Sequence, residues 1–210
     1  MARVGGSGYL RGVRWDNLFD DLEGQLEHEL NAEEVDLRAE EERLRLARLS
    51  LRDRLTSLAG GHGTRAGILR VALTSGEVIT LRPTTFGRDW LAADLLDAST
   101  LGVQCVLPLA AVSGVIVAAD DVAASLAAEP GRTARLVDRI GLSFVLRDLC
   151  RRRASVEVRT RAGVLTGTID RVGRDHFDLA VHAAGTVRRA AEVRHARIVP
   201  LAEIQLVLLF

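Results

Sequence analysis

Residues 158–204 contain three short stretches, which read Val158-Arg159-Thr160-Arg161-Ala162-Gly163, Val172-Gly173-Arg174-Asp175-His176-Phe177 and Ile198-Val199-Pro200-Leu201-Ala202-Glu203-Ile204. About ninety residues earlier, the chain reads Val71-Ala72-Leu73-Thr74-Ser75-Gly76, Phe86-Gly87-Arg88-Asp89-Trp90-Leu91 and Val106-Leu107-Pro108-Leu109-Ala110-Ala111-Val112. Both copies place Gly-Arg-Asp before an aromatic ring and Pro-Leu-Ala near the end. Solenoid units span only about 20–50 residues, so this longer period predicts a duplicated domain.

Runs of apolar residues predict that each copy is built from strands. In the first copy the runs are Ile68–Leu73, Val78–Leu81, Trp90–Leu95 and Gln104–Val117. In the second copy strands are expected from about Ser155 to the end, beginning with the half-buried pattern Val156-Glu157-Val158-Arg159. Aromatic residues make up only 4% of the chain, which suits small barrels built from Val, Leu and Ile. We therefore predict a mainly β chain with helices, of the α+β class, that contains two small β-barrels.

The residues ahead of the first copy have a helical pattern. Apolar side chains recur there at spacings of three and four, with acidic residues on the flanks. They are Trp15, Leu18, Phe19, Leu22, Leu26 and Leu30. A second apolar phase begins at Leu37, and the shift after Leu30 predicts two helices or one bent helix. The helical period returns from Thr133 to Arg153, ahead of the second copy.

These patterns divide the chain into five segments. The expected boundaries are a flexible tail at 1–14, an amphipathic helical segment at 15–60, a first barrel at 65–118, a linker at 119–132, and a helix with a second barrel at 133–210. We call 65–118 the first repeat and 133–210 the second repeat. A repeat of this size would be only marginally stable by itself, so we expect it to pack against helices or against the other repeat.

The charge of the chain is zero overall but unevenly distributed. All 28 basic residues are arginine, and they are balanced by 28 acidic residues. Residues 1–60 hold 9 Arg and 13 acids, residues 61–130 hold 4 and 7, and residues 131–210 hold 15 and 8, which gives −4, −3 and +7. Only the last segment has the electrostatic character of a polyanion-binding protein.

The sequence gives no sign of catalytic, metal or cofactor chemistry. Its five histidines and two cysteines show no H-x-x-x-H or C-x-x-C spacing, and no nucleophile or nucleotide-binding motif occurs. Cys105 and Cys150 are expected to be reduced thiols in apolar surroundings. Neither a signal peptide nor an apolar stretch of membrane-spanning length is evident, so we expect a cytoplasmic protein that does not enter the membrane.

The stretch Gly163-Val164-Leu165-Thr166-Gly167-Thr168-Ile169-Asp170-Arg171-Val172-Gly173-Arg174-Asp175-His176-Phe177-Asp178-Leu179 resembles the first motif of Sm-like proteins, especially in the form seen in the bacterial RNA chaperone Hfq. The first repeat matches less well, because Thr80-Leu81 stands where a second glycine would let the strand bend strongly. The order of one helix and two barrels also resembles an actinobacterial protein family. The resemblance implies two Sm-like barrels.

The same resemblance implies an RNA site in the second repeat. It would place a nucleotide near Asp175, His176 and Phe177 and near the later pair His195 and Arg197. Arg151, Arg152, Arg153 and Arg174 would meet phosphates, with Arg159, Arg161 and Arg171 beside them. In the first repeat, Trp90 and Leu91 stand at the positions of His176 and Phe177. In place of His195 and Arg197 it has only Gln104, Cys105 and Val106. The alternative is that Phe177 and Trp90 are barrel core and that the arginines form a solvated face.

Two non-enzymatic functions therefore remain open. In one, the second repeat binds RNA. In the other, the chain is a protein adaptor or scaffold whose acidic helix docks on a partner through Trp15, Leu18, Phe19, Leu22 and Leu26. The alternative for that helix is packing on its own barrels. The apolar strand Ile204–Phe210 would otherwise leave an open sheet edge. We expect the first repeat to cover it, as a pseudo-dimer within the chain. The alternative is a homo-oligomer.

Overall fold

The computed structural model describes residues 13–60, 67–96, 102–127, 135–185 and 188–210. The chain divides into two parts, residues 1–49 and residues 50–210, and each is described by itself. The expected tail at 1–14 lies almost wholly outside the described residues.

The first part contains one long helix, α1 (Val13–Arg48), of 36 residues. Ion pairs between successive turns support it, including Arg38 with Glu34 at 2.5 Å and Arg45 with Glu42 at 2.6 Å. The helix continues through the expected change of phase between Leu30 and Leu37. The interruption instead falls at Leu49 and Ser50, because Ser50 caps the next helix with its side chain.

The second part, residues 50–210, carries three α-helices among its described residues. They are α2 (Leu51–Ala59), α3 (Val122–Leu126) and α4 (Leu142–Arg152). Short 3₁₀ turns lie between the regular elements, at η1 (Leu109–Ala111), η2 (Ala119–Asp121), η3 (Leu136–Arg139), η4 (Ala190–Glu192) and η5 (Leu201–Glu203). Helix α2 precedes the strands of the first repeat, and α4 precedes those of the second.

Ten antiparallel strands form one continuous sheet. Those of the first repeat are β1 (Leu69–Leu73), β2 (Val78–Phe86), β3 (Trp90–Leu95), β4 (Gln104–Pro108) and β5 (Val112–Ile116). Those of the second repeat are β6 (Ser155–Thr160), β7 (Gly163–Val172), β8 (His176–Val181), β9 (His195–Pro200) and β10 (Ile204–Leu209).

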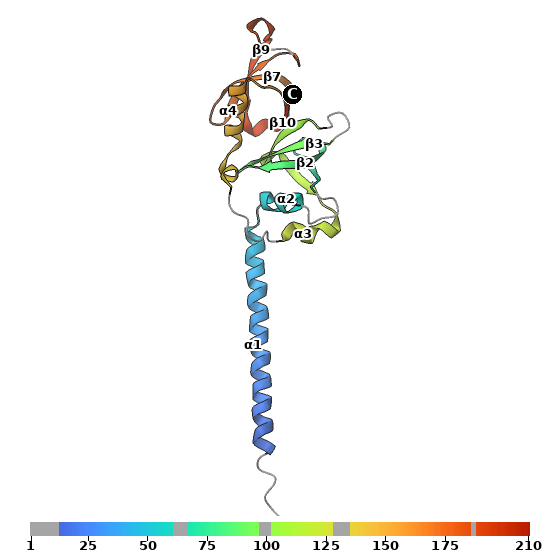
Figure 1. Cartoon of the computed structure of the whole chain (residues 1–210), viewed down its shortest axis with the longest axis vertical. Coiled ribbons are helices and arrows are strands. Elements are labelled where there is room, and N and C mark those ends of the chain that lie inside the picture. The colour runs from blue at the N-terminus through green and yellow to red at the C-terminus, as the bar shows by residue number, and fades with distance from the viewer. Residues whose placement is uncertain (1–12, 61–66, 97–101, 128–134, 186–187) are drawn as a thin grey trace, which may run out of the picture. The chain divides into compact units, whose positions relative to one another are not determined.

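The strand order is β5-β1-β2-β3-β4-β10-β6-β7-β8-β9. The second repeat therefore follows the first in the same internal order, with β10 in the place of β5. Figure 1 shows the first repeat in green and the second in orange to red, with β10 between them. The expected two barrels are therefore not confirmed, because the strands form one open sheet. Each repeat contributes five strands to it, and the last strand of each repeat pairs with its first strand.

The two repeats are joined by pairing between β4 and β10. Val207 lies opposite Val106, Leu208 opposite Cys105 and Leu209 opposite Gln104. Two polar contacts add to the junction. Gln205 Oε1 accepts a hydrogen bond from Thr74 Oγ1 at 2.8 Å, and Arg159 Nη1 lies 2.9 Å from Glu77 Oε1. The expected internal pairing of the C-terminal apolar strand is therefore present.

The strands β4 and β10 also link two hydrophobic cores. Leu206 and Leu208 lie in the core of the first repeat together with Leu55 of α2. Val207 lies in the core of the second repeat together with Leu146 of α4 and with Trp90, Val106 and Ala92 from the first repeat. Since successive side chains of a strand point to opposite faces, one strand serves both cores.

The segment expected as a linker, 119–132, differs from that prediction in its described part. Residues 119–126 form η2 and α3, and Ser125 is buried. Arg54 of α2 donates a hydrogen bond to Ser125 Oγ at 2.8 Å. The stretch 119–126 thus contacts α2 through Ser125 and belongs to the folded body.

Candidate nucleic-acid interface

The basic triplet Arg151, Arg152 and Arg153 closes α4, at the negative end of its helix dipole. Arg151 and Arg152 both pair with Asp148, with Arg152 Nε at 2.6 Å. Arg153 adopts a left-handed backbone and its Nη1 lies 3.2 Å from Asp170 Oδ1. Hydrogen bonding from Arg151 lowers the pKa of Asp148, so this carboxylate stays charged. The triplet is exposed, but each arginine already has an acidic partner.

The Gly-Arg-Asp loop of the second repeat is open to solvent. Arg174, Asp175 and His176 are exposed, and His176 Nδ1 lies 2.8 Å from Asp175 Oδ1. The hydrogen bond from His176 lowers the pKa of Asp175. Phe177 is different: its ring is 0% exposed and belongs to the core of the second repeat. The expected stacking role for Phe177 is corrected by this burial, because a base cannot reach its face.

His195 and Arg197 lie on β9 and are both exposed. They do not lie beside the loop. In the pairing of β8 with β9, His195 is opposite Val181 and Arg197 opposite Leu179, whereas His176 is opposite Pro200. His176 and His195 therefore lie at opposite ends of the ladder, on the order of 15 Å apart at the rise of a strand. The structure does not bring these predicted site residues together in one nucleotide pocket.

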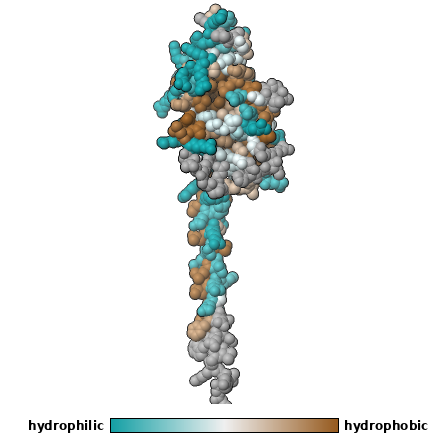
Figure 2. Space-filling view, in the orientation of Figure 1, coloured by the Kyte–Doolittle hydropathy of each residue, from teal (hydrophilic) through white to brown (hydrophobic). Residues whose placement is uncertain are grey.

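The remaining arginines of the second repeat fall into two groups. Several are in ion pairs, namely Arg159 with Glu157, Arg161 with Glu203, Arg171 with Asp178 and Arg188 with Asp170. Others are exposed and have no ion pair among the described residues, and around β8 and β9 these are Arg174 just before β8, Arg189 and Arg194 before β9, and Arg197 on β9. Figure 2 shows hydrophilic residues gathered toward the end of the sheet where β9 lies. We call these four residues the free-arginine stripe.

The equivalent loop of the first repeat contacts the start of α4. Trp90 is buried and its Nε1 donates a hydrogen bond to the Ile140 carbonyl at 2.9 Å. Asp89 Oδ1 accepts a hydrogen bond from the Leu142 amide at 2.8 Å, at the first residue of α4. Leu91 is fully buried. This loop therefore positions a helix. Sequence reasoning missed that role, since Asp89 lies 53 residues from Leu142 and no local signal links them.

The predicted partner-binding face of α1 is solvent-exposed where its side chains are described. Phe19 is 59% exposed, Leu22 50% and Leu26 57%. Trp15 and Leu18 belong to α1, but their side chains lie outside the described set. Figure 2 shows further apolar residues recurring along this helix.

Within the described ranges, no group of three or more His, Cys, Asp or Glu side chains could hold a metal ion. Cys105 is a buried free thiol, and Cys150 is half-buried with its Sγ 3.3 Å from the Asp170 carbonyl oxygen. No described helix has the length and apolar character needed to cross a membrane.

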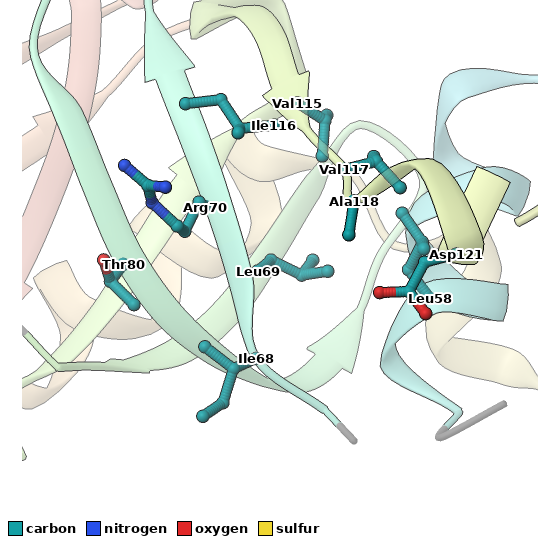
Figure 3. Close-up of a pocket in the computed structure, with 10 residues that line it drawn as sticks. All are labelled: Leu58, Ile68, Leu69, Arg70, Thr80, Val115, Ile116, Val117, Ala118 and Asp121. Carbon is teal, nitrogen blue, oxygen red and sulfur yellow. The ribbon is translucent and has the colours of Figure 1, made fainter. Parts of the chain in front are cut away.

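One pocket of about 630 Å³ lies beside β5, at the edge of the sheet. Its walls are largely apolar, and Figure 3 shows them supplied by α2, β1, β5 and the residues after β5. Its lining includes Leu58, Leu69, Arg70, Val115, Val117 and Asp121. The pocket lies in the first repeat and includes none of the predicted RNA-site residues.

Comparison of the chain with known proteins gave no family assignment. No protein-family model matches it. Neither a curated protein nor a solved structure matches it either.

Proposed function

We propose that the chain is a non-enzymatic, Sm-like tandem-repeat protein whose second repeat binds the phosphate backbone of single-stranded RNA. The observation that carries this proposal is the free-arginine stripe, Arg174, Arg189, Arg194 and Arg197, on β9 and in the loops before β8 and β9. The stripe belongs to the segment with a net charge of +7 at residues 131–210, where 15 Arg face 8 acids. Guanidinium groups without an acidic partner are available to bind phosphates.

The shape of the site supports backbone contacts over recognition of bases. Phe177 and Trp90 are core residues, and the histidines His176 and His195 lie at opposite ends of the ladder. The two aromatic rings at the Sm-like positions are thus buried, so neither offers the stacking that commonly holds unpaired bases. We therefore expect RNA binding that is strongly electrostatic and weakly dependent on sequence.

The proposal is tested by fluorescence anisotropy with labelled single-stranded RNA of two unrelated sequences. The variant R174Q/R194Q/R197Q should lose affinity by roughly tenfold or more for both RNAs, because each free arginine lost removes a phosphate contact. The matched control R151Q/R152Q/R153Q removes the same formal charge from arginines that are already ion-paired, and it should lose much less. Equal losses in both variants, or no loss in the first, contradict the proposed site.

A second candidate function is that of a protein adaptor. The observation that favours it is the exposure of Phe19, Leu22 and Leu26 on one stripe of α1. Large apolar side chains that recur at helical spacing on a surface are typical of a helix that docks in a partner's groove.

This second function is tested on the full chain with F19E/L22E/L26E, recovered from its native cells after crosslinking. Loss of a stoichiometric protein partner, with RNA recovery unchanged, would support the adaptor function. The control E23Q/E27Q changes the charge of the helix and keeps its apolar stripe. Partner recovery that survives the triple change assigns the contact to another surface.

A further inference from the structure

The pocket beside β5 opens at the point where strands β1 and β5 part. Arg70 of β1 lies opposite Ile116 of β5, and this is the last pair of their ladder. The chain reaches β1 from α2 and leaves β5 for η2 and α3, so the two segments diverge beyond that pair. The hollow between them has a volume of about 630 Å³. Small-molecule sites typically occupy about 300–1,000 Å³, and this hollow lies within that range.

The inner wall of the hollow is apolar and continuous with the core of the first repeat. Leu69 is buried in that core, and Leu58 of α2 and Val115 of β5 pack against it. Val117, which follows β5, is half-buried and lines the hollow with them. Figure 3 shows Leu69 directed toward the side where Ala118 lies. An apolar ligand body that enters on this side is therefore removed from water.

Among the described lining residues one is basic, and it lies at the mouth of the hollow. Arg70 stands on β1 between Thr80 of β2 and Ile116 of β5, directly opposite both. Its side chain is exposed and has no ion pair among the described residues. Figure 3 shows its guanidinium directed away from Leu58 and Asp121. A guanidinium binds a carboxylate through two parallel hydrogen bonds, so Arg70 is an anchor for an anionic group.

The second repeat shows that the fold itself does not need a base at this place. By strand register, Glu157 of β6 is the counterpart of Arg70, and Arg159 is the counterpart of Ala72. Glu157 Oε1 lies 3.2 Å from Arg159 Nε, so its charge has a partner within its own strand. Arg70 has the uncharged Ala72 at the equivalent position. The strand thus supplies no counter-charge for Arg70, which favours a ligand as its partner.

A second charged residue sets the direction in which an anion enters. Asp121 of η2 lines the opposite side of the hollow, next to Leu58, as Figure 3 shows. Its carboxylate repels another carboxylate and so excludes an anionic head from that side. The head of an anionic ligand therefore lies at Arg70, and its apolar body lies along Leu69 and Val117.

The charges and the walls also select the ligand class. One guanidinium that shares a hollow with a carboxylate balances a single negative charge. A phosphate monoester carries about −1.5 to −2 at neutral pH and would leave negative charge unbalanced. The apolar lining residues are Leu, Ile, Val and Ala, and no described lining residue is aromatic. Such walls suit a flexible aliphatic chain, because they offer no flat face on which a ring would stack.

We propose that the hollow beside β5 binds a free fatty carboxylate, which has one anionic head and an unbranched apolar chain. The Arg70 guanidinium donates two hydrogen bonds to the carboxylate, beside Thr80. The chain passes between the diverging segments and is buried against Leu69, Val115 and Val117. The site belongs to the first repeat and includes none of the free-arginine stripe, so this proposal is independent of RNA binding.

The test is isothermal titration calorimetry of the RNA-free full chain with decanoate, below its micellar concentration. The wild type should bind a single decanoate and saturate. The variant R70Q should bind roughly tenfold or more weakly, because the charge-assisted hydrogen bonds to the head are lost. The matched control R82Q removes another exposed arginine, on β2, that is not among the residues lining the hollow, and it should leave the affinity unchanged.

Changes to the ligand test its head and its chain separately. Each buried methylene raises affinity by about fourfold, so octanoate, two methylenes shorter, should bind on the order of fifteenfold more weakly. Decanol keeps the chain and has a neutral head, so it should bind more weakly than decanoate and should be insensitive to R70Q. The variant V117F fills the apolar side and should weaken decanoate and decanol alike. Circular dichroism checks that both variants fold, and the ligand series does not depend on either.

Three results overturn the proposal. The first is a wild type that shows no saturable binding of decanoate at millimolar concentration. The second is decanol that binds as tightly as decanoate, which would make the hollow a general apolar surface without an anion site. The third is equal losses in R70Q and R82Q, which would assign the effect to the net charge of the chain and not to Arg70.

Discussion

Val106 of β4 lies directly opposite Val207 of β10, and this pair is the centre of the junction between the two repeats. Both side chains are almost fully buried, at 3% and 0% exposure. Val106 comes from the first repeat but lies in the core of the second. The two repeats therefore depend on each other for burial of their cores.

Replacing Val207 by Ala should lower the free energy of unfolding by about 2 kcal/mol, through lost burial and the cavity that remains. Because β10 serves both cores, the whole body 50–210 should still unfold in one transition. The check is thermal unfolding followed by Trp90 fluorescence in a W15F background and by circular dichroism. The control V164A, at an exposed position, should change stability by less than about 0.5 kcal/mol. Two separate transitions in the wild type would contradict this interdependence.

Gly167 on β7 should tolerate no larger residue. A Cβ at this position would lie 2.1 Å from the Ala180 carbonyl oxygen of the neighbouring strand. The variant G167A should therefore lose about 1–3 kcal/mol of stability, or fail to fold, because backbone must shift to make room. Denaturant unfolding measures the loss. The control G114A lies on β5, where an added Cβ has nothing within 4 Å, and it should be nearly neutral.

Arg52 and Asp138 form a largely buried ion pair between α2 and η3, with 2.5 Å between Arg52 Nη2 and Asp138 Oδ1. Arg52 Nε also donates to the Gly87 carbonyl at 2.5 Å. The variant R52A should cost roughly 2–4 kcal/mol, because it leaves polar groups without their partner in a mostly buried site. The control R88A removes an exposed pair with Asp89 at 3.6 Å and should cost far less. Equal losses in urea unfolding would contradict the assigned burial.

The sequence allowed several strands to be predicted closely, because their apolar patterns are local. Strand β3 begins and ends where expected, at Trp90–Leu95. The run Gln104–Val117 was predicted as one strand and is divided by the turn η1 after Pro108, which a proline without an amide hydrogen favours. Helix α1 could be predicted from its apolar stripe, although not its continuity past Leu30.

Long-range features could not be predicted in the same way. The pairing of β4 with β10 joins residues about a hundred positions apart, and both strands are nearly continuous apolar runs without a face preference. The shared Gly-Arg-Asp motif indicated a common role, yet Asp89 caps a distant helix while Asp175 is exposed. Stacking by Phe177 was an expectation from resemblance alone, and burial in the core removes it.

The pKa of Asp175 should depend on His176. A lowered pKa in the folded state stabilises the fold above the ordinary carboxyl pKa of about 3.9, and this contribution is lost as pH falls through the folded value. In H176A, a carboxyl titration followed by NMR should show the pKa of Asp175 rising toward its ordinary value. Asp148, whose pKa is lowered by Arg151 and Arg152, should titrate unchanged in the same spectra. An unchanged pKa of Asp175 in H176A would contradict the hydrogen bond from His176.

The most direct measurement for the proposed function is the salt dependence of wild-type affinity for single-stranded RNA. Four free arginines that each meet one phosphate predict a slope of log affinity against log salt near −3, since each contact on a single strand contributes about −0.7. The same slope should appear with both RNA sequences. A slope near zero, or the absence of saturable binding at low salt, would contradict phosphate recognition by the second repeat.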